Sequence, residues 1–245
     1  MRKARVRKDR GRYHTIIRGV NKQDIFYDNA DREYFLELMA RFGKKFGIIY
    51  YTYVIMDNHV HLLFADNSNL LSKFMQIICS VYARYFNRKY DRIGHLFADR
   101  FASKIINDDS QLLTSCRYIL QNPQKAGICR ASKYKWSSYN AYRKGSSLVD
   151  TKLIMSMFTS LDKLYKYMDE TNDDSCLEIE LRPSERHEQM VIKIMNLLQS
   201  DTPLINPALP KNQIRQQMRI LKNAGLSIRN ISRITGIGTY LIQTS

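Results

Sequence analysis

Cysteine, proline and long apolar stretches are scarce in this chain of 245 residues. The four cysteines show no Cys-x-x-Cys spacing, which argues against a zinc site or a disulfide framework and for reduced thiols. The longest strongly apolar stretch, residues 48–56, is much shorter than the roughly 20 residues of a membrane span. No apolar signal-peptide segment follows the basic first dozen residues. We therefore expect a cytoplasmic protein without a membrane partner.

Acidic residues are few beside the basic ones. The chain has 23 Asp and Glu against 39 Lys and Arg, which gives a formal net charge of +16 and a pI near 9.7. A surface with this charge attracts polyanions, and a phosphate backbone adds affinity through counterion release. The alternatives are a basic protein without such a partner and, less favoured, an acidic membrane surface. We expect a nucleic-acid partner and association with the nucleoid.

The hydrophobic periodicity of residues 13–146 predicts an α+β domain. Strand-like segments at 13–18, 48–56, 60–65 and 96–106 alternate with helical spacing at 31–46, 70–90 and 112–121. The last of these helices is expected to stop at Asn122-Pro123, because proline restricts the residue before it. The order β-α-β-β-α-β-α is that of a ferredoxin-like antiparallel sheet with flanking helices.

Three further segments flank this domain. Residues 1–12 form an arm with seven basic residues and one acid, which either lies along phosphates or is a solvated tail. Residues 147–210 are expected to be an acidic connector, a helix at about 184–199 and a linker with three prolines. Residues 211–245 hold six basic residues, no acid and three short helical stretches between glycine turns. This pattern predicts a small all-α helix-turn-helix segment that anchors DNA phosphates, although a bundle without a DNA role has the same spacing.

Two groups of side chains in the α+β domain could carry chemistry. His59 and His61 stand two apart on a predicted strand, so both imidazoles project from the same face and form half of a metal site. A pair of surface histidines is the alternative. Tyr118 lies on a predicted helix, with the amides of Gln121 and Asn122 three and four residues later and near its face. Without further context, Tyr118 would be one core aromatic among 16 tyrosines.

The order of several short motifs resembles the single-tyrosine HUH transposases, also called IS200-like, and most of all the branch associated with repetitive extragenic palindromes. The resemblance covers roughly residues 11–145, and the combination of motifs is more specific than any one of them. The matching segments are Tyr13-His14 with Arg18-Gly19, residues 53–63, residues 94–97 with Arg100-Phe101, residues 117–119 with Asn122-Pro123 and Ala126-Gly127, and residues 136–139.

The resemblance implies a metal-dependent endonuclease that cuts single-stranded DNA near hairpins and forms a 5′-phosphotyrosine. Tyr118 matches the nucleophile, and His59 and His61 match a pair that binds Mg²⁺ or Mn²⁺. Many relatives have a glutamine four residues after the tyrosine as third ligand. Here that position is Asn122, so we expect Asn122 as the ligand, with Gln121 as the alternative. His14 and His95 also lie in matching segments, and a structural role is expected for both.

Two other interpretations are kept open. The chain could be a domesticated DNA-binding protein that has the same fold but does not cleave, or, less favoured, a replication initiator or relaxase with the same chemistry. A homodimer is compatible with the sequence. The basic side chains expected to contact DNA are Arg12, Arg18, Arg84, Arg88, Arg100, Arg229 and Arg233.

Overall fold

The computed structural model divides the chain into two compact units, Met1–Ile179 and Glu180–Ser245. It describes residues 10–98, 100–172, 190–191, 194–200, 202, 204–206 and 209–244. The expected basic arm therefore lies outside the described residues as far as residue 9. Each unit is described by itself below.

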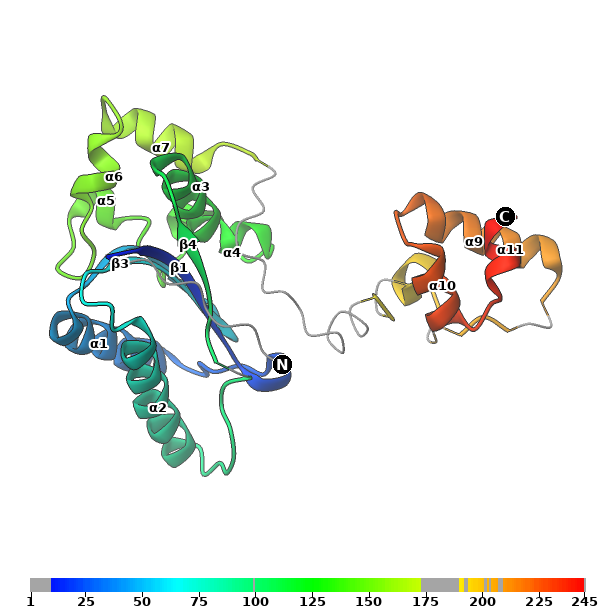
Figure 1. Cartoon of the computed structure of the whole chain (residues 1–245), viewed down its shortest axis with the longest axis horizontal. Coiled ribbons are helices and arrows are strands. Elements are labelled where there is room, and N and C mark those ends of the chain that lie inside the picture. Colours follow the sequence, from blue (N-terminus) through cyan, green and yellow to red (C-terminus); the bar gives the residue numbers. More distant parts are fainter. Residues whose placement is uncertain are drawn as a thin grey trace. The chain divides into compact units, whose positions relative to one another are not determined.

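The first unit is built on a four-stranded sheet in which every neighbouring pair is antiparallel (Figure 1). The strand order β2-β3-β1-β4 is the ferredoxin-like order, as the sequence predicts. The first three strands match the expected ranges to within one residue at each end, and the last strand begins six residues later than expected. Residues 96–98 instead bond to the end of β1 and the loop that follows it. The Leu96 carbonyl accepts from the Val20 N–H, and the Ala98 N–H donates to the Arg18 carbonyl. The strands are β1 (Arg12–Arg18), β2 (Ile48–Ile55), β3 (His59–Asp66) and β4 (Ala102–Ile106).

Helices α1 (Asn29–Phe46) and α2 (Leu71–Lys89) cover one face of the sheet (Figure 1). Asp28 begins α1 with a capping box that it shares with Asp31, and Gly47 ends the helix at φ 63°, a left-handed conformation that glycine adopts without strain. Apart from Thr15 and Asp66, the alternate side chains of β1 and β3 that face these helices are apolar, which explains the deep core between the layers. Its fully buried members include Phe35, Ile55, Val60, Leu62, Phe64, Phe74 and Tyr82.

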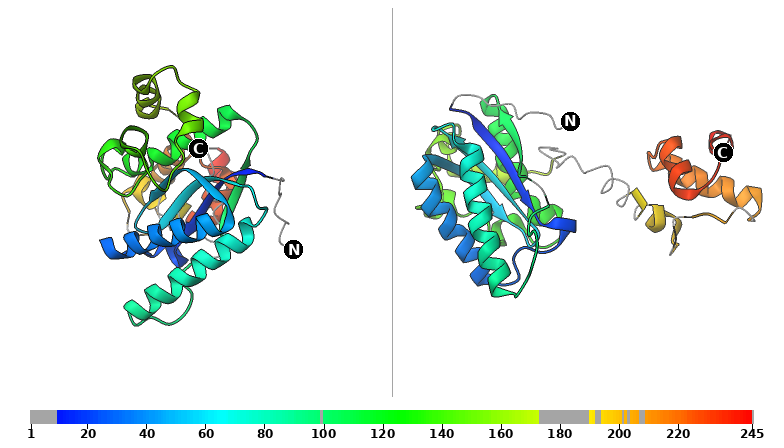
Figure 2. Two further views of the ribbon diagram at one scale, coloured as in Figure 1. Left: turned by 90° about the vertical axis from the view of Figure 1, so that its left-hand side faces the viewer. Right: turned by 60° about the horizontal axis from the view of Figure 1, so that its bottom comes forward.

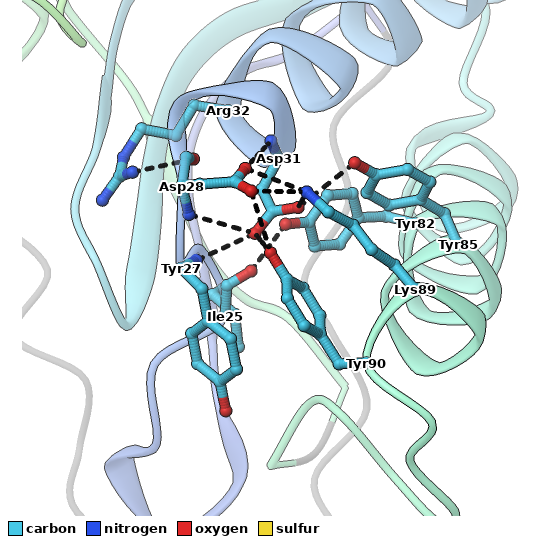
Figure 3. Close-up of polar contacts among 9 residues, drawn as sticks. All are labelled: Ile25, Tyr27, Asp28, Asp31, Arg32, Tyr82, Tyr85, Lys89 and Tyr90. Carbon is cyan, nitrogen blue, oxygen red and sulfur yellow. Dashed lines mark hydrogen bonds and ion pairs between the residues drawn. The ribbon is translucent and has the colours of Figure 1, made fainter.

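A polar cluster ties α1 to α2 around the buried carboxylate of Asp31, and we call it the Asp31 cluster (Figure 3). Lys89 donates to Asp31 at 2.7 Å and to Asp28 at 2.8 Å, and the Tyr90 hydroxyl donates to Asp31 at 2.7 Å. The backbone N–H of Tyr27 and the hydroxyl of Tyr85 donate to Asp31 as well, at 2.8 and 3.2 Å. Each Asp31 oxygen therefore has its acceptor capacity used, which offsets the cost of burying a charge.

The other face of the sheet carries α3 and a set of short helices, as Figure 2 shows from two further sides. Residues 147–172 do not form the expected acidic connector. Ile154, Leu164 and Met168 are buried in the core beneath α3, while the acids of this stretch lie exposed. Apolar burial therefore decides the structure here, and net charge does not. The helices are α3 (Asp109–Leu120), α4 (Asn122–Lys125), α5 (Ala141–Lys144), α6 (Lys152–Ser156) and α7 (Leu161–Asp169), with 3₁₀ turns at Val20–Lys22 and Ala131–Lys133.

In the described part of the second unit, three helices after residue 210 lie at the positions that the sequence predicts. They are α9 (Lys211–Asn223), α10 (Ile228–Thr235) and α11 (Thr239–Gln243), around a core that includes Met218, Leu221 and Ile231. Ser227 caps α10, and Gly236 ends it in a left-handed conformation. Of the helix expected over 184–199, residues 190–191 and 194–199 are described, and all of them except Gln199 are helical. Among the described helices of the chain, none is long and apolar enough to cross a membrane.

Candidate metal and nucleophile site

The turn between β2 and β3 is held firmly where it leads into His59. Asp57 forms an ion pair with the nearly buried Arg32, and its carbonyl accepts from the N–H groups of Ile25 and Phe26 at 2.8 and 3.1 Å. Gly19 lies against the same turn and donates its N–H to the Asn58 carbonyl at 2.9 Å. A Cβ at this glycine would lie 2.1 Å from a backbone oxygen, so only glycine fits.

The alternation of β3 puts the two histidines on the α3 face of the sheet. Val60 between them is fully buried in the core on the opposite face, as the sequence predicts. The His59 and His61 ring centroids are 4.9 Å apart. On the neighbouring strand β1, Arg18 pairs with His59 in the register and Ile16 with His61.

Helix α3 brings Tyr118 to this pair. Asp108 caps the helix by accepting from the Gln111 N–H, and the buried side of α3 packs on β2 and β3. The ring of Tyr118 is part-buried and lies 5.9 Å from the ring of His61, centroid to centroid. The ammonium of Lys125, on the next short helix, lies 5.0 Å from the centroid of the Tyr118 ring. Phenol, imidazole and a cation therefore meet at one place.

The two candidate amides behave differently. Gln121 is buried and its side chain donates to the carbonyls of Met168 and Glu170 at 2.7 and 3.0 Å, so it fastens α3 to the end of α7. Asn122 lies within reach of His59 and raises its pKa slightly against the larger effect of burial, and its amide nitrogen donates to the carbonyl of Tyr118 at 3.0 Å. The geometry thus brings Asn122, and not Gln121, to the histidines.

Each histidine of the pair has one ring nitrogen engaged in a hydrogen bond. Nδ1 of His59 lies 2.6 Å from Oδ1 of Asn58, and Nδ1 of His61 lies 3.0 Å from Nε2 of His14. Nδ1 of each ring is thus taken by a neighbouring residue, and Nε2 is the nitrogen through which each ring could bind a metal. The donor set of two imidazoles and an amide oxygen fits part of a divalent metal shell, and imidazole suits Mn²⁺ better than Mg²⁺. Among the described residues, no cluster of three or more His, Cys, Asp and Glu offers another metal site.

Burial keeps these rings neutral at ordinary pH. It lowers the pKa of His59 to about 4, with a further lowering by the cation of Arg18. Burial likewise lowers the pKa of His14 to about 3, and Lys104 adds to the effect. The pKa of His61 is well below its usual value, first because of burial and then because of the other two histidines. Neutral imidazoles are the form that binds metals.

His14 and Lys125 are the members of this site that sequence reasoning missed. A structural role is expected for His14, and the structure adds that its ring lies 5.2 Å from that of His61 and 6.1 Å from that of Tyr118. Its position on the same sheet face as His61 follows from the alternation of β1 once the register with β3 is known. Lys125 carried no signal, because its approach to Tyr118 depends on the break between α3 and α4.

The expected DNA-contacting arginines lie in different places. Arg18 borders the site. Arg12 pairs with Asp109, and Arg84 and Arg88 are exposed on α2, across the sheet from the site. Arg100 and the exposed His95 line a groove of about 740 Å³ beside α2. Arg229 and Arg233 are exposed on α10 of the second unit.

Fold and site together define a class: a ferredoxin-like domain that holds paired imidazoles and a phenol on one face of its sheet. Residues 8–122 match the family model described as transposase IS200 like. Over these residues, a little under half of the chain, the sequence is similar to the IS200-like transposases, which supports a transposase-like, DNA-processing role.

One solved structure supports the fold. A REP-associated tyrosine transposase bound to a REP hairpin superposes with a TM-score of 0.55 at 12% identity, over 74% of this chain and 98% of that chain. A Deinococcus radiodurans R1 structure described as a transposase has 15% identity over 46% of this chain and 91% of its own, but its TM-score of 0.35 is too low to inform the fold. None of the curated proteins matches the chain.

Proposed function

We propose that the chain is a metal-dependent single-strand DNA endonuclease and strand transferase with Tyr118 as its nucleophile. The observation that carries the proposal is the meeting of Tyr118 with His61 and His14 on one sheet face, at ring distances of 5.9 and 6.1 Å. The phenol oxygen attacks phosphorus, forming a P–O bond to tyrosine. The P–O3′ bond breaks, the phenol loses its proton to solvent, and the 3′ oxygen gains one. The 5′-phosphotyrosine conserves the bond for rejoining.

We propose His59, His61 and Asn122 as protein ligands of a divalent metal, with Mn²⁺ favoured by the imidazoles and Mg²⁺ as the alternative. When bound, such an ion supplies Lewis-acid polarisation of the scissile phosphate. The chain's own residues do the rest: Lys125 and Arg18 offer cations to the phosphate, and α3 holds the phenol at a fixed distance from the imidazoles. A hairpin-bearing single strand is the substrate that we propose, because the REP-associated neighbour is bound to a hairpin.

The second unit is proposed to anchor DNA phosphates. Lys211, Arg215, Arg219 and Lys222 follow one another along α9 at steps of four, four and three residues, so they share one helix face. Arg229 and Arg233 stand one turn apart on α10, and residues 211–244 contain no acid. Helix-turn-helix docking into a groove remains a prediction. Residence on the nucleoid would follow from this binding.

The test is the covalent product. Full-length protein is incubated with Mn²⁺ and a labelled single-stranded hairpin from the DNA that flanks its gene. We expect a protein species heavier by the downstream DNA fragment, with the modified peptide around Tyr118. Tyr118→Phe should bind DNA as before but give neither adduct nor nick, because a phenyl ring cannot attack phosphorus. Tyr27→Phe is the matched control and should form the adduct, because it removes an exposed hydroxyl that points away from the Asp31 cluster (Figure 3).

The other outcomes are equally informative. Nicking by Tyr118→Phe without an adduct would mean that activated water cuts the strand, and the transposase chemistry would have to be withdrawn. Hairpin binding without any nick or adduct in the wild-type protein would support the alternative, a DNA-binding protein of this fold that does not cleave.

A further inference from the structure

His14 is a buried side chain with an incomplete set of hydrogen bonds beside the proposed metal ligands. It is 1% exposed, and its Nε2 lies 3.0 Å from Nδ1 of His61. Within the described part of the chain, its other nitrogen, Nδ1, has no hydrogen-bond partner. The pairing of β1 with both β3 and β4 holds the residue rigidly, with Leu63 and Lys104 as its register partners.

The contact between His14 and His61 has two possible directions, because each neutral ring carries one proton. If His61 Nδ1–H donates to His14, then Nε2 of His61 keeps its lone pair and can bind a metal. If His14 Nε2–H donates instead, the proton of His61 must sit on its own Nε2, and that nitrogen is blocked. Only the first direction permits His61 to be a ligand.

The neighbouring histidine has no such ambiguity. The partner of His59 is the amide oxygen of Asn58 at 2.6 Å, and an oxygen can only accept. The tautomer of His59 is therefore set by Asn58, whereas that of His61 depends on which way His14 is protonated. Partners of this kind hold a ligand's ring orientation and its basicity in metal sites generally.

We propose that His14 is a positioning residue that accepts the His61 Nδ1 proton and thereby directs His61 Nε2 toward the divalent metal. This inference rests on the proposed metal site and assigns to it a residue outside the ligand set. His14 does not touch the metal or the reacting atoms in this arrangement. In this arrangement the ring proton of His14 lies on Nδ1, the nitrogen that has no hydrogen-bond partner among the described residues.

The experiment measures Mn²⁺ binding to the full-length protein without DNA, by electron paramagnetic resonance of the free ion. His14→Leu introduces an apolar side chain of similar bulk and removes the hydrogen-bond acceptor. We expect the affinity for Mn²⁺ to fall about 10- to 100-fold. His14→Gln offers an amide oxygen near the position of Nε2 and should recover most of that loss. Thr15→Val is the matched control: Thr15 is fully buried on the same strand with its side chain on the opposite face, and the affinity should not change.

A second readout follows the tautomer directly. In ¹⁵N nuclear magnetic resonance of the metal-free protein, we expect His61 to carry its proton on Nδ1, and to lose this preference in His14→Leu. A wild-type His61 protonated on Nε2 would overturn the inference even if His14→Leu did not fold. Wild-type Mn²⁺ affinity in a folded His14→Leu would overturn it as well.

The failure of this inference can be told apart from the failure of the metal site. If His61→Ala loses Mn²⁺ and His14→Leu does not, only the positioning role is wrong. If His61→Ala binds Mn²⁺ as the wild type does, the proposed site itself is wrong and the role of His14 falls with it.

Discussion

The Asp31 cluster makes a strong prediction about the stability of the first unit. Asp31 is fully buried and accepts from Lys89 and Tyr90 at 2.7 Å. Asp31→Asn keeps the size of the side chain but removes the charge and turns one acceptor oxygen into a donor, which then faces other donors. Removing one partner of a buried ion pair costs about 3–5 kcal/mol. The side chain of Lys89 is 28% exposed and still has its ion pair with Asp28 in this variant. We therefore expect a loss at the lower end of this range, about 3 kcal/mol.

The assay is urea unfolding followed by the fluorescence of Trp136. It is the only tryptophan, and it packs on the cores of the first unit, so the signal reports this unit alone. A loss of about 3 kcal/mol in a unit of this size corresponds to a fall in Tm of about 6–12 °C. The slope of the unfolding free energy against urea concentration should stay the same, because the substitution does not change the surface area that unfolding exposes.

Asp28→Asn is the matched control, since it makes the same chemical change at the other carboxylate that Lys89 contacts. Its side chain is 50% exposed, and asparagine caps a helix about as well as aspartate does. We expect a loss below about 1 kcal/mol, as for a surface ion pair. Equal losses in the two variants would refute the reasoning, because burial would then not decide the strength of the cluster.

Three further predictions follow from the site and the second unit. In metal-free protein the histidines of the site have pKa values lowered by burial, to about 3 for His14 and about 4 for His59, while the unfolded chain takes up protons near pH 6.5. The unfolding free energy should therefore be level above pH 6.5 and fall toward pH 4, by up to about 1.4 kcal/mol per pH unit for each histidine; a constant urea midpoint would contradict this. Gln121→Ala should cost about 1–3 kcal/mol of stability, because it leaves the Met168 carbonyl without its donor. Asn122→Ala should instead leave stability unchanged and weaken Mn²⁺ binding. The reverse pattern would make Gln121 the ligand. Replacing Arg229 and Arg233 by glutamine should make the logarithmic salt dependence of duplex binding shallower by about 0.9 for each lost phosphate contact, and an unchanged slope would remove the second unit from the DNA interface.

The helices and strands of the first unit were largely predictable because their core sides repeat every second or every three to four residues. The spacing of His59 and His61 was enough to place both on one face. The position of His14 beside His61 was not predictable, because it depends on the register between β1 and β3, which neither strand's own pattern sets.

Two other features could not be read from local pattern. The boundary after residue 146 was expected where acids accumulate, but the few apolar residues of α6 and α7, such as Ile154 and Leu164, are fully or almost fully buried and hold the segment on α3. The choice between Gln121 and Asn122 depends on how the chain turns between α3 and α4. Gln121 and Asn122 point in different directions at this break between helices, and their spacing from Tyr118 does not specify which of the two faces the histidines.

The edges of the sheet bear on how the protein avoids aggregation. Along the free side of β2, Ile55 N–H donates to the Trp136 carbonyl, while the Tyr53 and Tyr50 carbonyls accept from Ser138 and Asp150. The segments that form the α3-side layer thus occupy the groups through which another chain's strand could add. In the described part of the chain, β4 keeps an outer side that pairs with no strand, but it is five residues long and has the exposed Lys104 at its centre. Short length and a central lysine both discourage the addition of a strand, so neither edge is a good template for amyloid-like growth.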